Sequence, residues 1–266
     1  MKSIITSISN GKGGVGKTTV TCNLGHAITR CGLKVLVIDM DPQGNTTSLL
    51  IPDSKINYSL YEHISSESKT PIEKCIHATF VDNLWCIPNV NETSGLEPEL
   101  IRNQDFDTIK RIRPFIQANY DFCIIDCPPN MGTWVITALT GSDFVIVPNL
   151  ANSTFSIDGL LNVMTLIDKI REEDNPDLKF LRLLINQVDK RKSISKFNIG
   201  QIKQHFPADK IFETRIPTNA PFETAEANNT TIFKEAPTSS GCKAYRSLAK
   251  EILDIFNIER HKNGKN

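Results

Sequence analysis

The feature that most constrains this chain is a glycine-rich stretch near its N-terminus, GKGGVGKTT at residues 11–19. It satisfies the pattern G-x-x-x-x-G-K-[ST], whose backbone N–H groups surround phosphate groups. An apolar run at residues 4–9 predicts a buried strand, and apolar residues at helical spacing follow from Lys17. Strand, glycine loop and helix appear in the order that the motif requires. The sequence therefore predicts a phosphate-binding loop in which Lys17 meets the β- and γ-phosphates and the Thr18 hydroxyl reaches Mg²⁺.

Two further apolar strands end on aspartates. KVLVID is followed by MDPQGN, which places Asp39 and Asp41 after a strand, and CIID closes on Asp126. Ligands of parallel sheets bind beyond the carboxyl ends of the strands, so we expect the loop and these aspartates to meet. Asp126 is expected to hold Mg²⁺ together with Thr18, Asp41 to orient or deprotonate an attacking water, and Asp39 to be structural. A loop-capping role for Asp126 and a turn-forming Asp-Pro at Asp41 are the alternatives.

The remaining pattern alternates strands with helices. Further strands are expected at 84–88, 143–148 and 181–186, and helices at about 105–118 and 157–171. This alternation predicts an α/β fold with a mainly parallel, twisted sheet and helices on both faces, as in P-loop NTPases. We expect one ATPase domain over residues 1–258 and a polar, frayed tail over 259–266.

Composition narrows the possible partners. Thirty Lys and Arg balance 30 Asp and Glu, so any affinity for DNA must come from a local patch. Seven cysteines without a secretory leader favour reduced thiols in the cytoplasm, and Cys123 and Cys127 are expected to be buried small side chains. The sequence has no apolar run of roughly 20 residues, so stable membrane insertion is not expected, although peripheral binding remains open. No H-x-x-x-H pair and no C-x-x-C occurs, which leaves Mg²⁺ as the expected metal.

KGGVGKTT, VIDMDPQGN and IIDCPP, in this order and spacing, resemble the ParA-type (Soj-like) partition ATPases of the deviant Walker-A class, which includes MinD. The resemblance covers most of the chain. In that family the first lysine of the loop reaches across a nucleotide-sandwich dimer to the partner's ATP, and Lys12 matches it. The resemblance thus implies an ATP-dependent homodimer with the catalytic set Lys12, Lys17 and Asp41. A solvated lysine in a glycine loop is the alternative for Lys12.

The resemblance also implies which residues bind ATP. Asn186, at the end of LRLLIN, would read the adenine edge, and the backbone around Ile216 and Pro217 would contact the base, while a turn-forming asparagine is the alternative for Asn186. The phosphate-binding residues would be Gly11, Lys12, Gly13, Gly14, Val15, Gly16, Lys17, Thr18 and Thr19.

ParA-type proteins bind DNA nonspecifically as ATP dimers, and a ParB-like partner on the cargo stimulates hydrolysis. The resemblance implies partition of a plasmid, a chromosome or a protein cargo, with the ATP form on the nucleoid. Thr218 stands where many relatives have an arginine, and no helix-turn-helix segment precedes the loop, so operator-specific repression is not expected. The basic candidates for DNA contact are Lys190, Arg191, Lys192, Lys196, Lys203, Arg215, Lys243 and Arg246, for which an ordinary solvated face is the alternative.

Two other classes of protein contain the same lysine-rich phosphate-binding loop. A MinD-like membrane ATPase needs a C-terminal amphipathic helix with a basic face, but Glu251 and Asp254 interrupt the basic face at 243–256, so we expect this helix to pack on the body. An iron–sulfur reductase needs cysteine ligands at a dimer face, and beside Cys127 the sequence offers no convincing second ligand.

Overall fold

The computed structural model describes residues 3–51, 56–152, 156–189 and 191–258, with the side chains of 156–159 excepted. The strands are β1 (Ile4–Ile8), β2 (Val35–Asp39), β3 (His77–Ala78), β4 (Leu84–Ile87), β5 (Phe122–Asp126), β6 (Phe144–Leu150) and β7 (Lys179–Asn186). The α-helices are α1 (Lys17–Thr29), α2 (Asn45–Leu50), α3 (Leu60–Ile64), α4 (Glu97–Asn103), α5 (Thr108–Asn119), α6 (Thr133–Thr140), α7 (Ser156–Glu173), α8 (Ser193–His205), α9 (Pro221–Ala227), α10 (Ile232–Glu235) and α11 (Ser240–Ile255). Short 3₁₀ segments lie at Ile72–Cys75, Asn91–Leu96 and Ala208–Lys210.

The strands form one seven-stranded sheet in the order β3-β4-β2-β5-β1-β6-β7. All neighbouring pairs are parallel except β3 with β4. The parallel register sets Ile8 and Asp39 on either side of Asp126. The three segments that follow β1, β2 and β5 therefore leave the sheet at one edge, as the sequence predicted.

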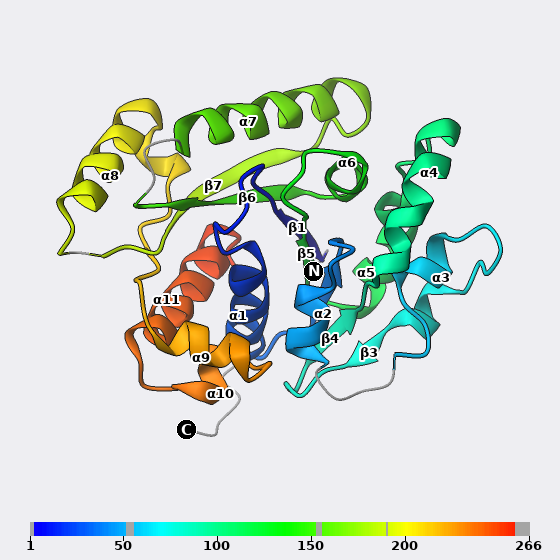
Figure 1. Cartoon of the computed structure of the whole chain (residues 1–266), viewed down its shortest axis with the longest axis horizontal. Coiled ribbons are helices and arrows are strands. Elements are labelled where there is room, and N and C mark those ends of the chain that lie inside the picture. The colour runs from blue at the N-terminus through cyan, green and yellow to red at the C-terminus, as the bar shows by residue number, and fades with distance from the viewer. Residues whose placement is uncertain (1–2, 52–55, 153–155, 190, 259–266) are drawn as a thin grey trace.

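Helices cover both faces of the sheet (Figure 1). One face, which includes Leu36 and Ile125, packs against α5, α6 and α7, and the other, which includes Val37 and Ile124, packs against α1 and α11. Alternate residues of the same strands point into these two apolar layers, because successive side chains of a strand face opposite sides. The predicted α/β fold with helices on both faces is confirmed.

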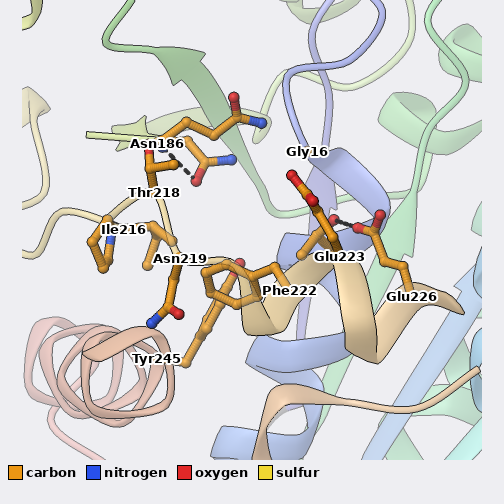
Figure 2. Close-up of a pocket in the computed structure, with 12 residues that line it drawn as sticks. Gly16, Asn186, Ile216, Thr218, Asn219, Phe222, Glu223, Glu226 and Tyr245 are labelled. Carbon is orange, nitrogen blue, oxygen red and sulfur yellow. Dashed lines mark hydrogen bonds between the residues drawn. The ribbon is translucent and has the colours of Figure 1, made fainter. Parts of the chain in front are cut away.

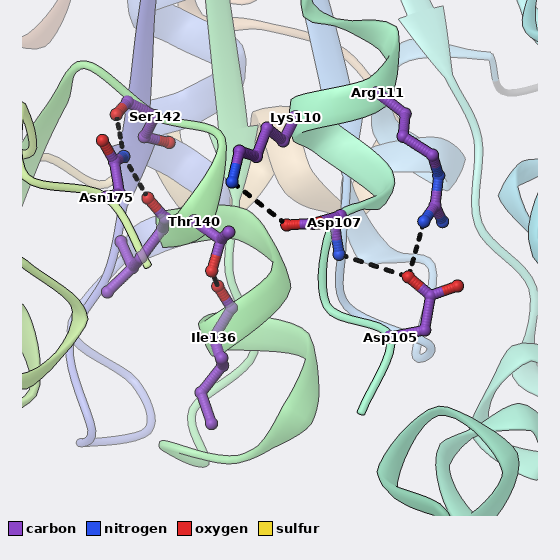
Figure 3. Close-up of polar contacts among 9 residues, drawn as sticks. Asp105, Asp107, Lys110, Arg111, Ile136, Thr140, Ser142 and Asn175 are labelled. Carbon is purple, nitrogen blue, oxygen red and sulfur yellow. Dashed lines mark hydrogen bonds and ion pairs between the residues drawn. The ribbon is translucent and has the colours of Figure 1, made fainter. Parts of the chain in front are cut away.

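The predicted helix at 105–118 begins three residues later, at Thr108. Asp105 accepts the backbone N–H of Asp107 at 3.4 Å and the guanidinium of Arg111 at 2.6 Å, so it closes a turn before the helix (Figure 3). Figure 3 also shows Asn175, whose side-chain amide donates to the carbonyl of Ser142 at 2.7 Å. This contact ties the segment before β7 to the segment that enters β6.

The C-terminal helix α11 packs against α1 through one buried face. Tyr245, Leu248 and Ile252 on this face are fully buried. The expected packing of this helix on the body of the protein is confirmed.

Candidate functional site

The glycine-rich loop joins β1 to α1 and is shaped by its glycines. Gly14 and Gly16 adopt φ of 72° and 85°, in the left-handed region that favours glycine. Gly16 is the N-cap of α1, so the loop delivers the chain directly to a helix N-terminus. Its geometry fits the predicted cradle for phosphate groups, because the first N–H groups of a helix have no intrahelical acceptor.

Lys17 lies folded into this loop. Its ammonium donates to the carbonyls of Asn10 at 3.2 Å and Lys12 at 3.3 Å, and the side chain is buried. Burial lowers the pKa of Lys17, and the nearby Asp126 opposes this shift. The lysine is thus held at the centre of the loop, where a phosphate would meet it.

Asn10, which sequence reasoning missed, fixes the first part of the loop, around Lys12. Its side-chain oxygen accepts the backbone N–H of Lys12 at 3.0 Å, and its amide donates to the carbonyl of Pro148 at 2.8 Å. The second contact anchors the loop to β6. Lys12 itself is half-buried, between the exposed Gly11 and Gly13.

The carboxylate of Asp126 is buried at the end of β5 and surrounded by hydroxyl groups. Thr18 and Thr46 both donate to its Oδ2 at 2.7 Å, and Thr21 donates to Oδ1 at 3.2 Å. Burial raises the pKa of Asp126 to about 6, although the threonine hydroxyls favour the ionised form. The structure thus brings together the two predicted Mg²⁺ residues, Thr18 and Asp126.

Asp39 lies beside Asp126 on the neighbouring strand, and its contacts agree with the expected structural role. Its Oδ2 accepts the N–H and the hydroxyl of Thr47 at 2.8 and 2.7 Å, and its Oδ1 accepts the N–H of Asp41 at 3.1 Å. Burial, together with the neighbouring Asp126, raises the pKa of Asp39 to about 8. Asp39 therefore braces the segment that carries Asp41.

Asp41 occupies a tight turn between β2 and α2. Its side chain accepts the N–H of Gln43 at 3.0 Å, and its carbonyl accepts the N–H of Gly44 at 2.9 Å. The turn-forming alternative considered for this residue is thus a real part of its structure. Both roles are compatible, since one carboxylate oxygen makes the turn contact.

A cavity of about 150 Å³ opens beside the glycine loop (Figure 2). Its walls combine apolar groups with amides and carboxylates, the mixture typical of small-molecule sites. The predicted base-binding residues Asn186, Ile216 and Pro217 line it. Sequence reasoning missed its other walls, which are formed by Gln187, Thr218, Asn219, Phe222, Glu223, Glu226 and Tyr245.

Asn186 also braces the glycine loop. Its amide donates to the carbonyl of Val15 at 2.7 Å, and its side-chain oxygen accepts the N–H of Gln187 at 2.9 Å. A Cβ on Gly16 would lie 2.5 Å from this amide nitrogen. The structure therefore gives Asn186 a structural contact, and its reading of the adenine edge stays a prediction.

Helix α9 closes the cavity from the far side. Glu226 accepts the hydroxyl of Thr19 at 2.5 Å, and Glu223 lies one turn before it (Figure 2). The loop residue Thr19 is thus linked to a residue 207 positions further along the chain.

The basic candidates come from several different elements of the structure. Arg191, Arg215 and Lys243 line a hollow of about 540 Å³, which shares Pro217 and Thr218 with the cavity. Lys192, Lys196 and Lys203 belong to α8 or its N-cap, and the guanidinium of Arg246 lies over the ring of Phe233, 5.7 Å from its centroid. Lys190 lies outside the described residues.

Arg191 is already paired. Its guanidinium contacts both carboxylate oxygens of Asp189, at 3.0 and 3.1 Å, while its own side chain is 90% exposed. The hollow therefore contains one carboxylate beside its three basic residues.

The oxygen donors of Thr18 and Asp126 suit Mg²⁺, which is commonly bound through one or two carboxylates together with phosphate oxygens and water. In the part of the chain that the structure describes, no group of three or more His, Cys, Asp or Glu side chains is placed to hold a metal. Cys123 and Cys127 are buried, as expected. Among the described helices, none is both long and apolar enough to cross a membrane.

Comparisons with known proteins agree with this geometry. A family model described as an AAA domain matches residues 2–180. The chain is 35% identical to the sporulation initiation inhibitor protein Soj of Bacillus subtilis, over 93% of this chain and 97% of Soj. It is 33% identical to the chromosome partitioning protein ParA of Myxococcus xanthus, over 94% of this chain and 87% of that protein.

A solved structure named cobyrinic acid a,c-diamide synthase, from Mycobacterium smegmatis with a bound ATP analogue and magnesium, is also similar. It has a TM-score of 0.82 and 27% identity, with 96% of each chain covered. This neighbour shares the fold and carries the ligands for which the loop and the Thr18–Asp126 pair are suited. The sequence relatives, the matched family model and the geometry of the site together place this chain in the ParA/MinD superfamily of P-loop ATPases, with the Soj and ParA partition proteins.

Proposed function

We propose that this protein is a Mg²⁺-dependent ATPase that positions cargo in the manner of ParA. It forms an ATP-dependent homodimer, binds DNA nonspecifically in that state, and hydrolyses ATP when a ParB-like partner on the cargo stimulates it. The observation that carries the proposal is the contact of Thr18 with Asp126 beside Lys17, at the sheet edge where Asp41 also lies. The similarity to Soj and ParA supports the partition role.

Each group at the sheet edge has a role in this hydrolysis. The loop N–H groups and Lys17 would hold the phosphates, and Thr18 and Asp126 would hold the metal. Mg²⁺, when bound, would offset the negative charge of the phosphate groups. Asp41 orients the attacking water and accepts its proton, as a general base does.

Lys12 is proposed to act on a second subunit. Lys17 already occupies the centre of its own loop, whereas Lys12 lies in the first part of the loop, beside exposed glycines. A cation supplied in trans to a neighbouring active site is comparable to an arginine finger. ATP favours the dimer only if it makes contacts there that ADP does not make, and a contact between its γ-phosphate and Lys12 of the second subunit would be one.

The proposed DNA surface is the hollow that contains Arg191, Arg215 and Lys243. Because the chain has no net charge, nonspecific affinity has to come from such a local group. Contacts to DNA phosphates release counterions, so binding weakens as salt rises. Dimerisation doubles the number of contacts, which makes DNA affinity depend on ATP.

Binding to a nonspecific duplex at several salt concentrations tests this function, with apo protein, with ADP and with a slowly hydrolysed ATP analogue. We expect binding only with the analogue, weakened steeply by salt. Arg215→Ala should weaken it, and Arg102→Ala, which removes an exposed arginine of α4 that is not among the candidates, is the matched control. Equal loss in both variants would remove the hollow as the DNA surface.

Anionic vesicles belong in the same experiment, because the MinD-like alternative requires a free amphipathic helix. The apolar face of α11 is buried against the body of the protein, which favours DNA over a membrane as the surface. Strong vesicle binding without DNA binding would reverse this choice.

A further inference from the structure

Two adjacent threonines at the start of α2 contact both buried aspartates. The hydroxyl of Thr46 donates to Asp126 Oδ2 at 2.7 Å. Thr47 donates its N–H and its hydroxyl to Asp39 Oδ2, at 2.8 and 2.7 Å. All four side chains are buried. One turn of helix therefore links the carboxyl ends of β2 and β5, beyond their pairing in the sheet.

The hydroxyl of Thr46 has a defined direction. The Cys22 thiol lies 3.7 Å from its oxygen and donates to it, while the threonine proton points to Asp126. Thr46 acts as a fixed donor to the carboxylate.

The contacts continue to the proposed water-orienting residue. Asp39 Oδ1 accepts the N–H of Asp41 at 3.1 Å, and Thr47 Oγ1 accepts the N–H of Asn89 at 2.9 Å. Hydrogen bonds, together with the peptide bond between Thr46 and Thr47, therefore connect Asp126 through Thr46, Thr47 and Asp39 to Asp41. The contact from Asn89 anchors the middle of this path to the segment that follows β4.

The hydroxyls of Thr18 and Thr46 both donate to Oδ2 of Asp126, but only one of them is also expected to bind the metal. Thr18 is the expected Mg²⁺ ligand, and ligation turns the lone pairs of its hydroxyl toward the ion. Thr46 has no such second task in the proposed site. It can keep the carboxylate oriented, in the way that groups behind a metal ligand commonly do.

We propose that Thr46 is a positioning residue that orients Asp126 for Mg²⁺ and, through Thr47 and Asp39, links loading of the metal to the placement of Asp41. This inference rests on the proposed Mg·ATP site. Thr46→Val removes the hydroxyl with little change in volume, and Thr46→Ser keeps it. Thr21→Val is the matched control, because Thr21 donates to the other oxygen of Asp126 from α1 rather than from α2.

Binding of a fluorescent ADP, titrated with and without Mg²⁺, measures the first part. Thr46→Val should raise the Mg²⁺ concentration that gives half of the maximal effect on ADP binding by about tenfold. A factor of this size corresponds to the loss of one hydrogen bond to a charged group. Binding of ADP without Mg²⁺ should not change. Thr46→Ser should restore the wild-type value, and Thr21→Val should change it much less, because its contact is longer. If Thr46→Val does not fold, as judged by circular dichroism, Thr46→Ala takes its place.

Amide hydrogen exchange measures the second part. Mg·ADP should slow exchange over residues 41–47 in the wild-type protein, and Thr46→Val should lose this slowing while the slowing over 11–19 persists. Equal effects of Thr46→Val and Thr21→Val, or no effect of Thr46→Val on either readout, would overturn the link while leaving the ATPase proposal intact. A wild-type protein whose ADP binding ignores Mg²⁺ would instead overturn the metal site, and the link with it.

Discussion

Gly13, Gly14 and Gly16 in the phosphate-binding loop differ in what a methyl group would encounter. A Cβ on Gly13 meets nothing within 4 Å, and its φ lies outside the left-handed region. A Cβ on Gly14 also meets nothing within 4 Å, but the backbone φ of this residue is +72°. The backbone φ of Gly16 is +85°, and a Cβ there would lie 2.5 Å from the amide nitrogen of Asn186. Alanine substitutions at the three positions therefore separate backbone strain from steric conflict.

The expected losses in the free energy of unfolding follow in that order. Gly13→Ala should change stability by about 0.5 kcal/mol or less, because nothing in the fold opposes it. Gly14→Ala should cost about 1–2 kcal/mol for a left-handed alanine. Gly16→Ala should cost about 2–4 kcal/mol, since Asn186 must also move and give up its hydrogen bond to Val15.

Urea unfolding of the nucleotide-free protein measures these differences. The double variant Gly16→Ala/Asn186→Ala should lose less than the sum of the two single variants, because the conflicting side chain is gone. Equal losses for Gly14→Ala and Gly16→Ala would show that the contact with Asn186 carries no energy, and would refute the steric part of the reasoning.

Three further predictions concern the site and the half-buried His26. Asp41→Ala should keep ATP binding and the ATP-dependent dimer but lower turnover about 100-fold or more, as measured by phosphate release; normal turnover would exclude Asp41 as the general base. Lys12→Ala should bind ATP but remain monomeric with a slowly hydrolysed analogue, and light scattering that still detects a dimer would contradict the contact in trans. Burial, with Arg30 adding to it, lowers the pKa of His26 to about 4, so the unfolded chain takes up this proton at higher pH than the folded protein does. Stability should fall by up to about 3 kcal/mol as pH drops from about 6.5 to 4, and His26→Gln should flatten this dependence in urea unfolding; an unchanged profile would assign the loss to other groups.

The sequence predicted those site residues that belong to a recognisable motif and lie at, or just after, the end of a strand. Lys17 and Thr18 follow a strand and open a helix within a few residues, and Asp126 ends a run of apolar residues. Local sequence determines such arrangements, and the parallel sheet then brings the strand ends together. The edge of the sheet was therefore predictable from the sequence.

The part of the cavity wall that α9 contributes was not predictable in this way. Phe222 and Glu226 reach the site from α9, far along the chain, and nothing in the sequence of this short helix marks it as facing the loop. The basic residues present a related problem, because sequence reports their charge but not the direction in which they point. Arg215 and Lys243 come together through tertiary packing, whereas Arg246, only three residues after Lys243, turns to the ring of Phe233.

The strand β3 escaped prediction because it has only two residues. Thr46 and Thr47 escaped it because threonines at a helix start usually serve as caps or surface residues. Only the folded chain shows that both hydroxyls point inward to carboxylates.

Pro217 and Thr218 line both the cavity and the basic hollow. A ligand in one of them that moves these two residues therefore changes the shape of the other. Thermodynamic reciprocity then requires that whatever factor a nucleotide imposes on affinity in the hollow, an occupant of the hollow imposes on affinity for the nucleotide. If ATP raises the affinity of the hollow for DNA, as proposed, DNA bound there raises the affinity of the cavity for ATP by the same factor.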